Sequence, residues 1–226
     1  MIEISTKNPR QSFFDELATS WNDNLTAENE IFIKTIIEKA NTIESIGKKV
    51  LDLGCGRGVL FPFLKDWEVV AFDISEEMLR QARLRACQNV VKYVQGDAHN
   101  LPFPSNYFAK VLMLSVFPHF DNPQKVLQEI YRVLKHEGIG ILIHLMDAHK
   151  VNEIHRSIGG AVKNDTLPEP YELLKLINNK GFDIIYENFD GCVAVIFKKP
   201  LVVKNIIGLS NSSTIVKQKE KVHNIY

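Results

Sequence analysis

A series of short apolar runs, alternating with amphipathic stretches between residues 48 and 200, most constrains how this chain can fold. Two of the runs, residues 110–116 and 139–145, are almost wholly apolar, which is typical of strands that helices cover on both faces. The stretches between the runs place apolar residues at helical spacing, as Met78 and Ala82 do in one of them. The pattern predicts a parallel sheet built from a strand–helix unit repeated five times.

Two further apolar runs near the end of this region predict a different connection. Residues 183–189 and 192–197 are separated by Asp190-Gly191, and this dipeptide is a strong hairpin signal. The fold class expected is therefore α/β: a Rossmann-like, doubly wound, mixed seven-stranded sheet with a C-terminal antiparallel hairpin. The five earlier strands are expected at residues 49–53, 69–72, 90–94, 110–116 and 139–145.

The regions on either side of this sheet differ from it in composition. Residues 1–47 show helical spacing and carry eight acidic side chains against four basic ones, and Gly47 is expected to end the helix. Residues 201–226 are polar and lysine-rich, so a basic, loosely held tail is expected there. The domain expected between these two regions spans residues 48–200.

Composition excludes several classes of protein. The chain has 226 residues, with 27 Lys and Arg balanced by 27 Asp and Glu, and lacks the positive excess of proteins that hold long nucleic acid by charge. Cys55, Cys87 and Cys192 form no CxxC pair, which favours a reducing, cytoplasmic compartment. The first residues show no apolar signal segment, and no apolar run approaches the ~18 residues that span a bilayer, so no membrane span is expected. The sequence predicts nothing about oligomeric state.

A glycine-rich loop directly follows the first apolar run. Gly54, Gly56 and Gly58 allow a tight turn and let a ligand approach the backbone closely. Asp73 closes the second strand, nineteen residues after Gly54, where a carboxylate can accept hydrogen bonds from ribose hydroxyls. This arrangement predicts a site for an adenosine-containing cofactor.

The spacing and charge of the loop separate two kinds of cofactor. Dinucleotide-binding loops read GxGxxG, whereas this loop reads GxGxG with Val59 after the third glycine. Asp52, two residues before Gly54, would repel a pyrophosphate but suits a positively charged ligand. S-adenosylmethionine carries a sulfonium and an ammonium group and no phosphate, so the loop favours it over NAD.

Four motifs, in order and at suitable spacing, resemble those of the class I S-adenosylmethionine-dependent methyltransferases, a broad group that includes quinone-biosynthesis C-methyltransferases. The motifs are VLDLGCGRG, AFDIS, QGDAHNLPFPSNYFAKVLMLSVFPHF and EIYRVLKHEGIGILIH. The resemblance covers residues 48–145 well and the N-terminal FFDELATSWND moderately, and it does not specify a substrate. One departure is the KHEG of residues 135–138, where the family usually has Lys-Pro-Gly-Gly.

The resemblance implies a role for residues of each motif. The glycine loop would wrap the methionine and ribose parts of the cofactor, and Asp73 would hold the ribose hydroxyls. Ile74 and Met78 would lie against the adenine, although a place for Met78 in the core is equally expected. An N-terminal helix carrying Trp21 would fold over the cofactor as a lid. The cofactor-binding residues so implied are Trp21, Asp52, Gly54, Gly56, Gly58, Asp73, Ile74, Met78, Asp97, Ala98 and Ser115; Phe13 and Phe14 neighbour Trp21 in the expected lid.

Histidines are the candidates for work on the methyl acceptor. Methyl transfer is an in-line displacement that an enzyme assists mainly by positioning, and a base is needed only when the acceptor must lose a proton. His119 follows the fourth strand and His144 closes the fifth, so both are candidate acceptor-binding or basic residues, a structural hydrogen bond being the alternative. His155 and Arg156, on the next expected helix, would contact an anionic acceptor or form a solvated helix face.

Several other chemistries are disfavoured. His144, Asp147, His149 and His155 show none of the compact zinc spacings, so no metal site is predicted. Residues 115–118 read SVFP rather than the Asn-Pro-Pro-aromatic run of amino-group methylating enzymes. The thiol that cytosine C5 methylation needs near the fourth or fifth strand is missing, as is the three-thiol pattern of arsenic methylation.

The function expected is methyl transfer from S-adenosylmethionine to a small-molecule acceptor, with residues 147–170 covering the acceptor pocket. One alternative is a methyltransferase acting on RNA or protein, which rests on six lysines against one glutamate from residue 198 onward. Another is an S-adenosylmethionine-binding protein without catalysis. Deleting residues 201–226 would separate the first two, because a small-molecule enzyme should keep its activity.

Overall fold

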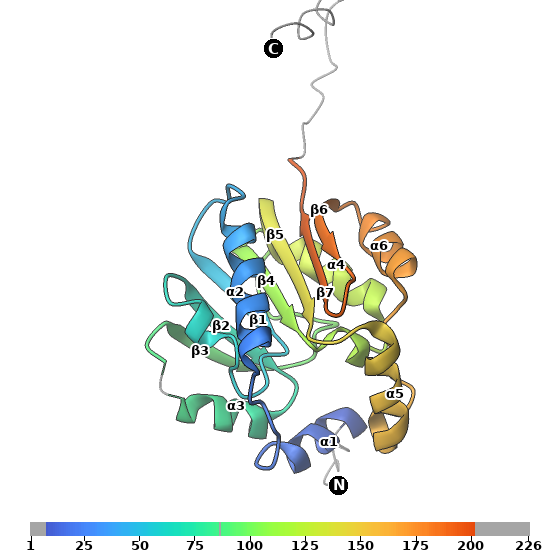
Figure 1. Cartoon of the computed structure of the whole chain (residues 1–226). Coiled ribbons are helices and arrows are strands. Elements are labelled where there is room, and N and C mark those ends of the chain that lie inside the picture. The colour runs from blue at the N-terminus through green and yellow to red at the C-terminus, as the bar shows by residue number, and fades with distance from the viewer. Residues whose placement is uncertain (1–7, 86, 202–226) are drawn as a thin grey trace, which may run out of the picture.

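The computed structural model describes residues 8–85 and 87–201, so all but the first residue of the expected basic tail lies outside the described part (Figure 1). Its centre is a seven-stranded sheet in the order β3-β2-β1-β4-β5-β7-β6. The first five strands pair in parallel, and β7 is antiparallel to both β5 and β6, which confirms the expected fold class and hairpin. The strands are β1 (Lys49–Leu53), β2 (Glu68–Asp73), β3 (Val90–Gln95), β4 (Phe108–Leu114), β5 (Leu134–His144), β6 (Asp183–Asn188) and β7 (Val193–Lys198).

Helices cover both faces of this sheet (Figure 1). On one face, α2, α3 and the short η1 pack against the sheet, and on the other face α4 and α6 do so. The central strands are therefore buried on both sides, which explains their continuous apolar sequence. The helices are α1 (Pro9–Leu17), α2 (Ala27–Asn41), α3 (Glu76–Leu84), α4 (Pro123–Val133), α5 (Ala148–Ile158) and α6 (Pro170–Asn178), with 3-10 turns η1 (Phe61–Phe63), η2 (Phe117–His119) and η3 (Gly160–Val162).

The strand order reverses between β1 and β4, and this places the ligand crevice. The chain moves outward from β1 through β2 to β3, and then returns to pair β4 with the other side of β1. In open α/β sheets, ligands bind outside the carboxyl ends of the strands at such a reversal. The loop after β1 is held there because the backbone N–H groups of Gly54 and Cys55 both donate to the Phe72 carbonyl, at 2.8 and 3.0 Å.

The N-terminal region contains two helices with different surroundings. In α2, Ile33, Ile36 and Ala40 are buried against the sheet, so this helix is part of the core. In α1, no residue is buried, and the helix lies at the carboxyl edge of the sheet, between α3 and α5 (Figure 1). Among the described residues, no helix is long and apolar enough to cross a membrane.

Two expectations about the helices are wrong. The helix of the N-terminal region ends at Asn41 rather than at Gly47, which lies in the turn before β1 with a φ of 105°. The strand–helix unit is not repeated five times, because β1 and β2 are joined only through η1, and no helix connects β3 to β4 in the described residues. Proline explains both short connections: Pro62 lies within η1, and Pro102 and Pro104 lie between β3 and β4, where each lacks the N–H that a helix would need.

Candidate active site

A cavity of about 440 Å³ lies at the carboxyl ends of β1, β2, β4 and β5, and residues of α1 and α5 also line it. The glycine loop and Asp73 line one half of it, and His119, His144 and His155 line the other. Apart from Gly58, which does not line the cavity, it brings together every cofactor residue that the resemblance implied. These are Trp21, Asp52, Gly54, Gly56, Asp73, Ile74, Met78, Asp97, Ala98 and Ser115.

The three glycines of the loop do different things. Gly54 and Gly58 adopt φ angles of 72° and 81°, and a Cβ atom on either would lie 2.3 Å from a side chain, that of Val116 or Phe61. Both are therefore required by the packing of the loop itself. Gly56 has a φ of 50°, but a Cβ atom there would meet no atom within 4 Å. Open space over a left-handed glycine at the cavity wall is what a ligand that touches the backbone needs.

Asp73 ties the glycine loop to the end of β2. Its Oδ2 accepts a hydrogen bond from the Gly56 N–H at 2.8 Å, and its Oδ1 accepts one from the Ser75 N–H at 2.9 Å. Burial raises the pKa of Asp73 to about 6, and these backbone donors counteract part of that rise. Each carboxylate oxygen keeps a second lone pair, so ribose hydroxyls can still bind.

Asp52 is the clearest sign that the cavity takes a cationic group. Its side chain is buried at the end of β1, and its Oδ2 has no hydrogen-bond partner among the described residues. Burial, followed by the charge of Asp73, raises the pKa of Asp52 to about 8. A buried carboxyl oxygen without a partner is costly, and a positively charged ligand would both satisfy it and favour its ionised form. The residues present therefore fit the ammonium and sulfonium groups of S-adenosylmethionine.

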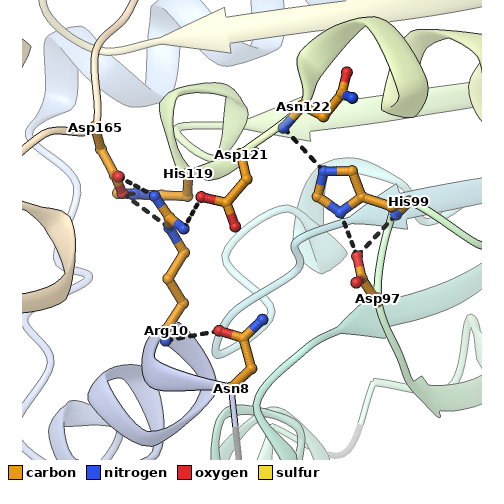
Figure 2. Close-up of polar contacts among 8 residues, drawn as sticks. All are labelled: Asn8, Arg10, Asp97, His99, His119, Asp121, Asn122 and Asp165. Carbon is orange, nitrogen blue, oxygen red and sulfur yellow. Dashed lines mark hydrogen bonds and ion pairs between the residues drawn. The ribbon is translucent and has the colours of Figure 1, made fainter.

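The expected adenine side of the cavity is present, with one addition. Ile74, Met78 and Ala98 line it, and Met78 is also almost fully buried, so its packing in the core is confirmed and its contact with adenine stays a prediction. The Oδ1 of Asp97 accepts a hydrogen bond from the backbone N–H of His99 and lies 2.5 Å from the ring Nδ1 of the same histidine (Figure 2). Asp97 is thus oriented by His99, which the sequence did not single out.

Ser115 marks a strained turn at the end of β4. Its φ is 53°, in the left-handed region that residues other than glycine seldom adopt, and its N–H donates to the Ile143 carbonyl at 2.8 Å. The strand therefore ends at Leu114, two residues earlier than expected, and Ser115 turns the chain along the cavity wall. Such strain is concentrated at functional sites, where the surrounding structure holds it in place.

Residue 165, which no sequence motif indicated, organises the acceptor half of the cavity. The Oδ2 of Asp165 lies 2.6 Å from the Nδ1 of His119, and its backbone carbonyl lies 2.9 Å from the Nδ1 of His155. Arg10 of α1 also hydrogen-bonds both carboxylate oxygens of Asp165 and pairs with Asp121 (Figure 2). No sequence signal points to this set, because Arg10 and Asp165 lie 155 residues apart.

His144 lies in the wall of the same half, at the end of β5. Its side chain is buried, and its Nε2 has no partner among the described residues. Burial, together with the nearby rings of His119 and His155, lowers the pKa of His144 to about 3, so the ring is neutral. A neutral imidazole nitrogen without a partner can hydrogen-bond a polar group of an acceptor.

The other residues considered on the acceptor side lie elsewhere. Arg156 is exposed and does not line the cavity. Asp147 accepts a hydrogen bond at the start of α5, and His149 lies 3.7 Å from Glu153 on the exposed face of that helix. These two are therefore separate from His144 and His155, and no metal-binding cluster occurs in residues 8–85 and 87–201.

Two acidic residues fasten the N-terminal segment over the cavity. Asp15 of α1 accepts hydrogen bonds from the Ser75 hydroxyl at 2.6 Å and from the Glu77 N–H at 3.2 Å, at the start of α3. Asp23 pairs with Arg85 at 2.5 Å, and also lies 3.8 Å from the Arg57 guanidinium. The negative charge of this region is thus used in part to hold it against basic and hydroxyl groups of the main domain.

Trp21 lies between these two fastening points, in the loop after α1 and not on a helix as expected. Its side chain is 37% exposed and lines the cavity, and its carbonyl accepts a hydrogen bond from Arg57 at 2.5 Å. The Phe14 ring lies edge-on to it, with the ring centroids 6.0 Å apart. Aromatic side chains therefore border the cavity on the side opposite the sheet.

Comparisons with known proteins agree with this geometry. Residues 51–142 match a family described as a methyltransferase domain. The chain is 33% identical over 101 residues to 2-methyl-6-phytyl-1,4-hydroquinone methyltransferase 1, chloroplastic, of Oryza sativa subsp. japonica, a match covering 43% of this chain and 31% of that protein. It is 27% identical over 182 residues to the demethylmenaquinone methyltransferase of Thermotoga maritima, covering 69% and 79% of the two chains.

The fold is also found among solved structures. A SAM-dependent methyltransferase from Aquifex aeolicus superposes with a TM-score of 0.62 at 21% identity, covering 86% of this chain and all of the other. The two chains therefore share their overall fold. The glycine loop, the unpartnered Asp52 and these matches together place the chain in the class I S-adenosylmethionine-dependent methyltransferase family.

Proposed function

We propose that this chain transfers the methyl group of S-adenosylmethionine to a small, largely apolar molecule bound in the same cavity. The observation that carries this proposal is the continuity of the cavity. It runs from the backbone of the glycine loop to His119 and His144, so donor and acceptor can be held next to each other. Holding two reactants in line supplies much of the catalysis that methyl transfer needs.

The shape and lining of the cavity favour a small acceptor. A volume of about 440 Å³ is within the range of small-molecule sites. Phe14 of α1 and Val151 and Ile154 of α5 also line it, so a macromolecular substrate would have to pass these helices to reach the histidines. The two relatives compared above are named as a 2-methyl-6-phytyl-1,4-hydroquinone methyltransferase and a demethylmenaquinone methyltransferase, which supports a small-molecule acceptor.

Three groups of residues would have different roles in this reaction: binding the donor, binding the acceptor and excluding water. Asp52 and Asp73 bind the charged and hydroxyl-bearing parts of the donor, which supplies a methyl group activated by positively charged sulfur. The acceptor lies against apolar side chains of α5, with His119 and His144 available for hydrogen bonds. The segment of α1 and Trp21 excludes water, which strengthens the electrostatic interactions inside. In this proposal, the lid is α1 with the loop after it, and residues 147–170 form the cover on the acceptor side.

Calorimetric titration with S-adenosylhomocysteine, with NAD in parallel, tests the donor part of the proposal. We expect micromolar binding of S-adenosylhomocysteine and none of NAD. Asp73→Ala should abolish the binding, and Asp66→Ala, in an exposed turn before β2, should not change it. Binding of NAD, or equal binding by the Asp73 variant, would contradict the assignment.

The acceptor part is tested by supplying labelled methyl donor together with a cell extract. Label should appear in the fraction extracted by organic solvent. Label that appears instead in acid-precipitated RNA or protein, and that depends on residues 202–226, would overturn the small-molecule proposal. Heat-inactivated protein serves as the blank.

A further inference from the structure

Resting on the proposed function, we propose that Asp165 is a positioning residue that holds His119 as a general base. The acceptor is then a molecule that gives up a proton when it is methylated, such as a phenol or an enol. An acceptor without an acidic proton needs no base. A residue that orients a base, as we propose for Asp165, therefore implies an acceptor that loses a proton.

The geometry fixes which ring nitrogen of His119 is free. Asp165 Oδ2 lies 2.6 Å from His119 Nδ1, and an ionised carboxylate only accepts hydrogen bonds, so the ring proton is on Nδ1. The Nε2 then carries a lone pair, and it makes no hydrogen bond to any described residue. The side chain of His119 is 13% exposed and lines the cavity, so this nitrogen is accessible to a bound acceptor.

Arg10 keeps Asp165 ionised. Although burial alone would raise it, the pKa of Asp165 is lowered overall, by hydrogen bonds from His119 and from Arg10. The Arg10 Nε lies 3.3 Å from Asp165 Oδ2, and a second guanidinium nitrogen binds Oδ1. Because the guanidinium compensates the carboxylate, Asp165 can remain an acceptor while the ring of His119 gains a proton.

The surroundings of His119 favour the neutral ring before reaction. The charged or titratable groups that face it are Arg10 from α1, His144 from β5, His155 from α5 and Asp165 itself. Burial lowers the pKa of His119 below its ordinary value, and Asp165 opposes this effect, while His155 and Arg10 add to it. A neutral imidazole with an oriented Nδ1–H is the form that can accept a proton.

The proposed methyl transfer moves one proton to His119 and one methyl group to the acceptor oxygen. The acceptor's O–H bond breaks, and its proton goes to the Nε2 of His119, while the electron pair stays on oxygen. That pair forms the new O–CH₃ bond as the bond from the methyl group to sulfur breaks and leaves its electrons on sulfur. The imidazolium later releases its proton to solvent, so no oxidant, reductant or other reactant is required.

A purely structural role for Asp165 is the competing explanation, because its pairing with Arg10 also fastens α1. The two roles predict different results for the ring of His119. A fastening role needs only the Arg10 contact, whereas a positioning role requires that Asp165 decides where the ring proton lies. Asp121, the other partner of Arg10, offers a matched variant that weakens the fastening without touching His119.

Nitrogen NMR of the histidine rings tests this difference in the whole chain, without any acceptor. In the wild type, with S-adenosylhomocysteine bound, the His119 proton should lie on Nδ1. Asp165→Asn should remove that preference and lower the pKa of His119, while Asp121→Asn should leave both unchanged. A proton on Nε2 in the wild type, or an unchanged ring in Asp165→Asn, would overturn the proposal. Binding of S-adenosylhomocysteine in the same samples tests the proposed function separately.

Methyl transfer to phenols of graded acidity gives a second readout. With a weakly acidic phenol as the probe, we expect His119→Gln to lower the rate at least about 100-fold and Asp165→Asn about 10-fold or more. With a nitrophenol, which is largely ionised in mildly alkaline buffer, both variants should approach the wild type, because no base is needed. Equal losses with both probes would show that the two residues act through structure or binding and not through the proton.

Discussion

The two halves of the cavity are built in different ways. The donor half is made largely of backbone and of residues that end two adjacent strands, Asp52 on β1 and Asp73 on β2. The acceptor half is made of side chains contributed by α1, η2, β5, α5 and the loop after η3, and Asp165 connects several of them. The residues of the donor half cannot change much unless the fold changes as well. The residues of the acceptor half can vary while the sheet stays the same.

This contrast explains why the sequence indicates the family and the methyl donor but does not indicate the acceptor. A glycine loop at a strand end is a local structure that neighbouring residues specify, and so it leaves a compact motif. Side chains that meet only through tertiary packing leave none. Substitutions in the donor half should therefore affect both the stability of the fold and the binding of the donor. Substitutions in the acceptor half should lower methyl transfer and leave the fold and donor binding in place.

The largest effect is expected from Gly54→Ala. Its φ of 72° is unfavourable for alanine, and the new Cβ would lie 2.3 Å from Val116. The left-handed strain and the overpacking together should lower the free energy of unfolding by about 3 kcal/mol and abolish binding of S-adenosylhomocysteine. Chemical denaturation and calorimetry measure the two losses.

Gly191→Ala is the matched control, because Gly191 has a φ of 68° in the hairpin loop but open space around it. It should cost only about 1 kcal/mol of stability and leave binding unchanged. Similar losses from both substitutions would mean that backbone strain alone, and not the packing of the glycine loop, matters at Gly54.

Asp52→Asn should weaken binding of S-adenosylhomocysteine about 10- to 100-fold, because the ammonium group loses a charged partner. It should also change the pH dependence of stability. The folded-state pKa values of Asp52 and Asp73, about 8 and about 6, exceed the ordinary value for aspartate, so the folded chain binds more protons than the unfolded chain. The free energy of unfolding should therefore fall as pH rises from about 4 to about 8.

In Asp52→Asn, the decrease in the free energy of unfolding as the pH approaches about 8 should disappear. Denaturation curves recorded at several pH values without ligand measure it. A variant with the same pH profile as the wild type would show that Asp52 is ionised in the folded chain at neutral pH.

Gly56→Ala sharpens the comparison within the loop itself. The new Cβ would meet no protein atom within 4 Å, so the cost in stability is limited to about 1 kcal/mol of backbone strain. If the donor occupies that space, binding should weaken at least about tenfold, by steric exclusion. Calorimetry on the folded variant decides the point, and unchanged affinity would place the donor away from Gly56.

His144→Leu tests the acceptor half. Because the Nε2 of His144 is buried without a partner in the described structure, an apolar side chain should be tolerated, with stability within about 1 kcal/mol of the wild type or above it. Binding of S-adenosylhomocysteine should persist while methyl transfer falls. Loss of the fold or of donor binding would show that His144 belongs to the framework instead.

The smallest effect is expected far from the cavity, at Glu137. This residue has a φ of 64° where the family usually has glycine, and it pairs with Lys198 of β7. Glu137→Gly relieves the backbone strain and removes the ion pair, so stability should change by less than about 1 kcal/mol. Donor affinity should stay the same, and a weakened affinity would reveal an unexpected link between the two ends of β5.

Much of the fold could be predicted because its signals are local. Apolar runs, the Asp190-Gly191 hairpin and the GxGxG loop each depend on neighbouring residues, and all three are present, although β4 lies two residues earlier than expected and β5 begins at Leu134 rather than at residue 139. The errors were local as well, and prolines account for one of them. The repeated strand–helix unit failed where Pro62 shortened one connection.

The sequence by itself determined the sheet, its hairpin and the loop that would hold a donor, because hydrophobic period, turn chemistry and glycine conformation act over a few residues. Only the tertiary structure decided that Arg10, His119, His155 and Asp165 meet in the acceptor half, and that Asp52, in the donor half, has an oxygen without a hydrogen-bond partner among the described residues. Such contacts join residues up to 155 positions apart, and they depend on how the helices close over the edge of the sheet.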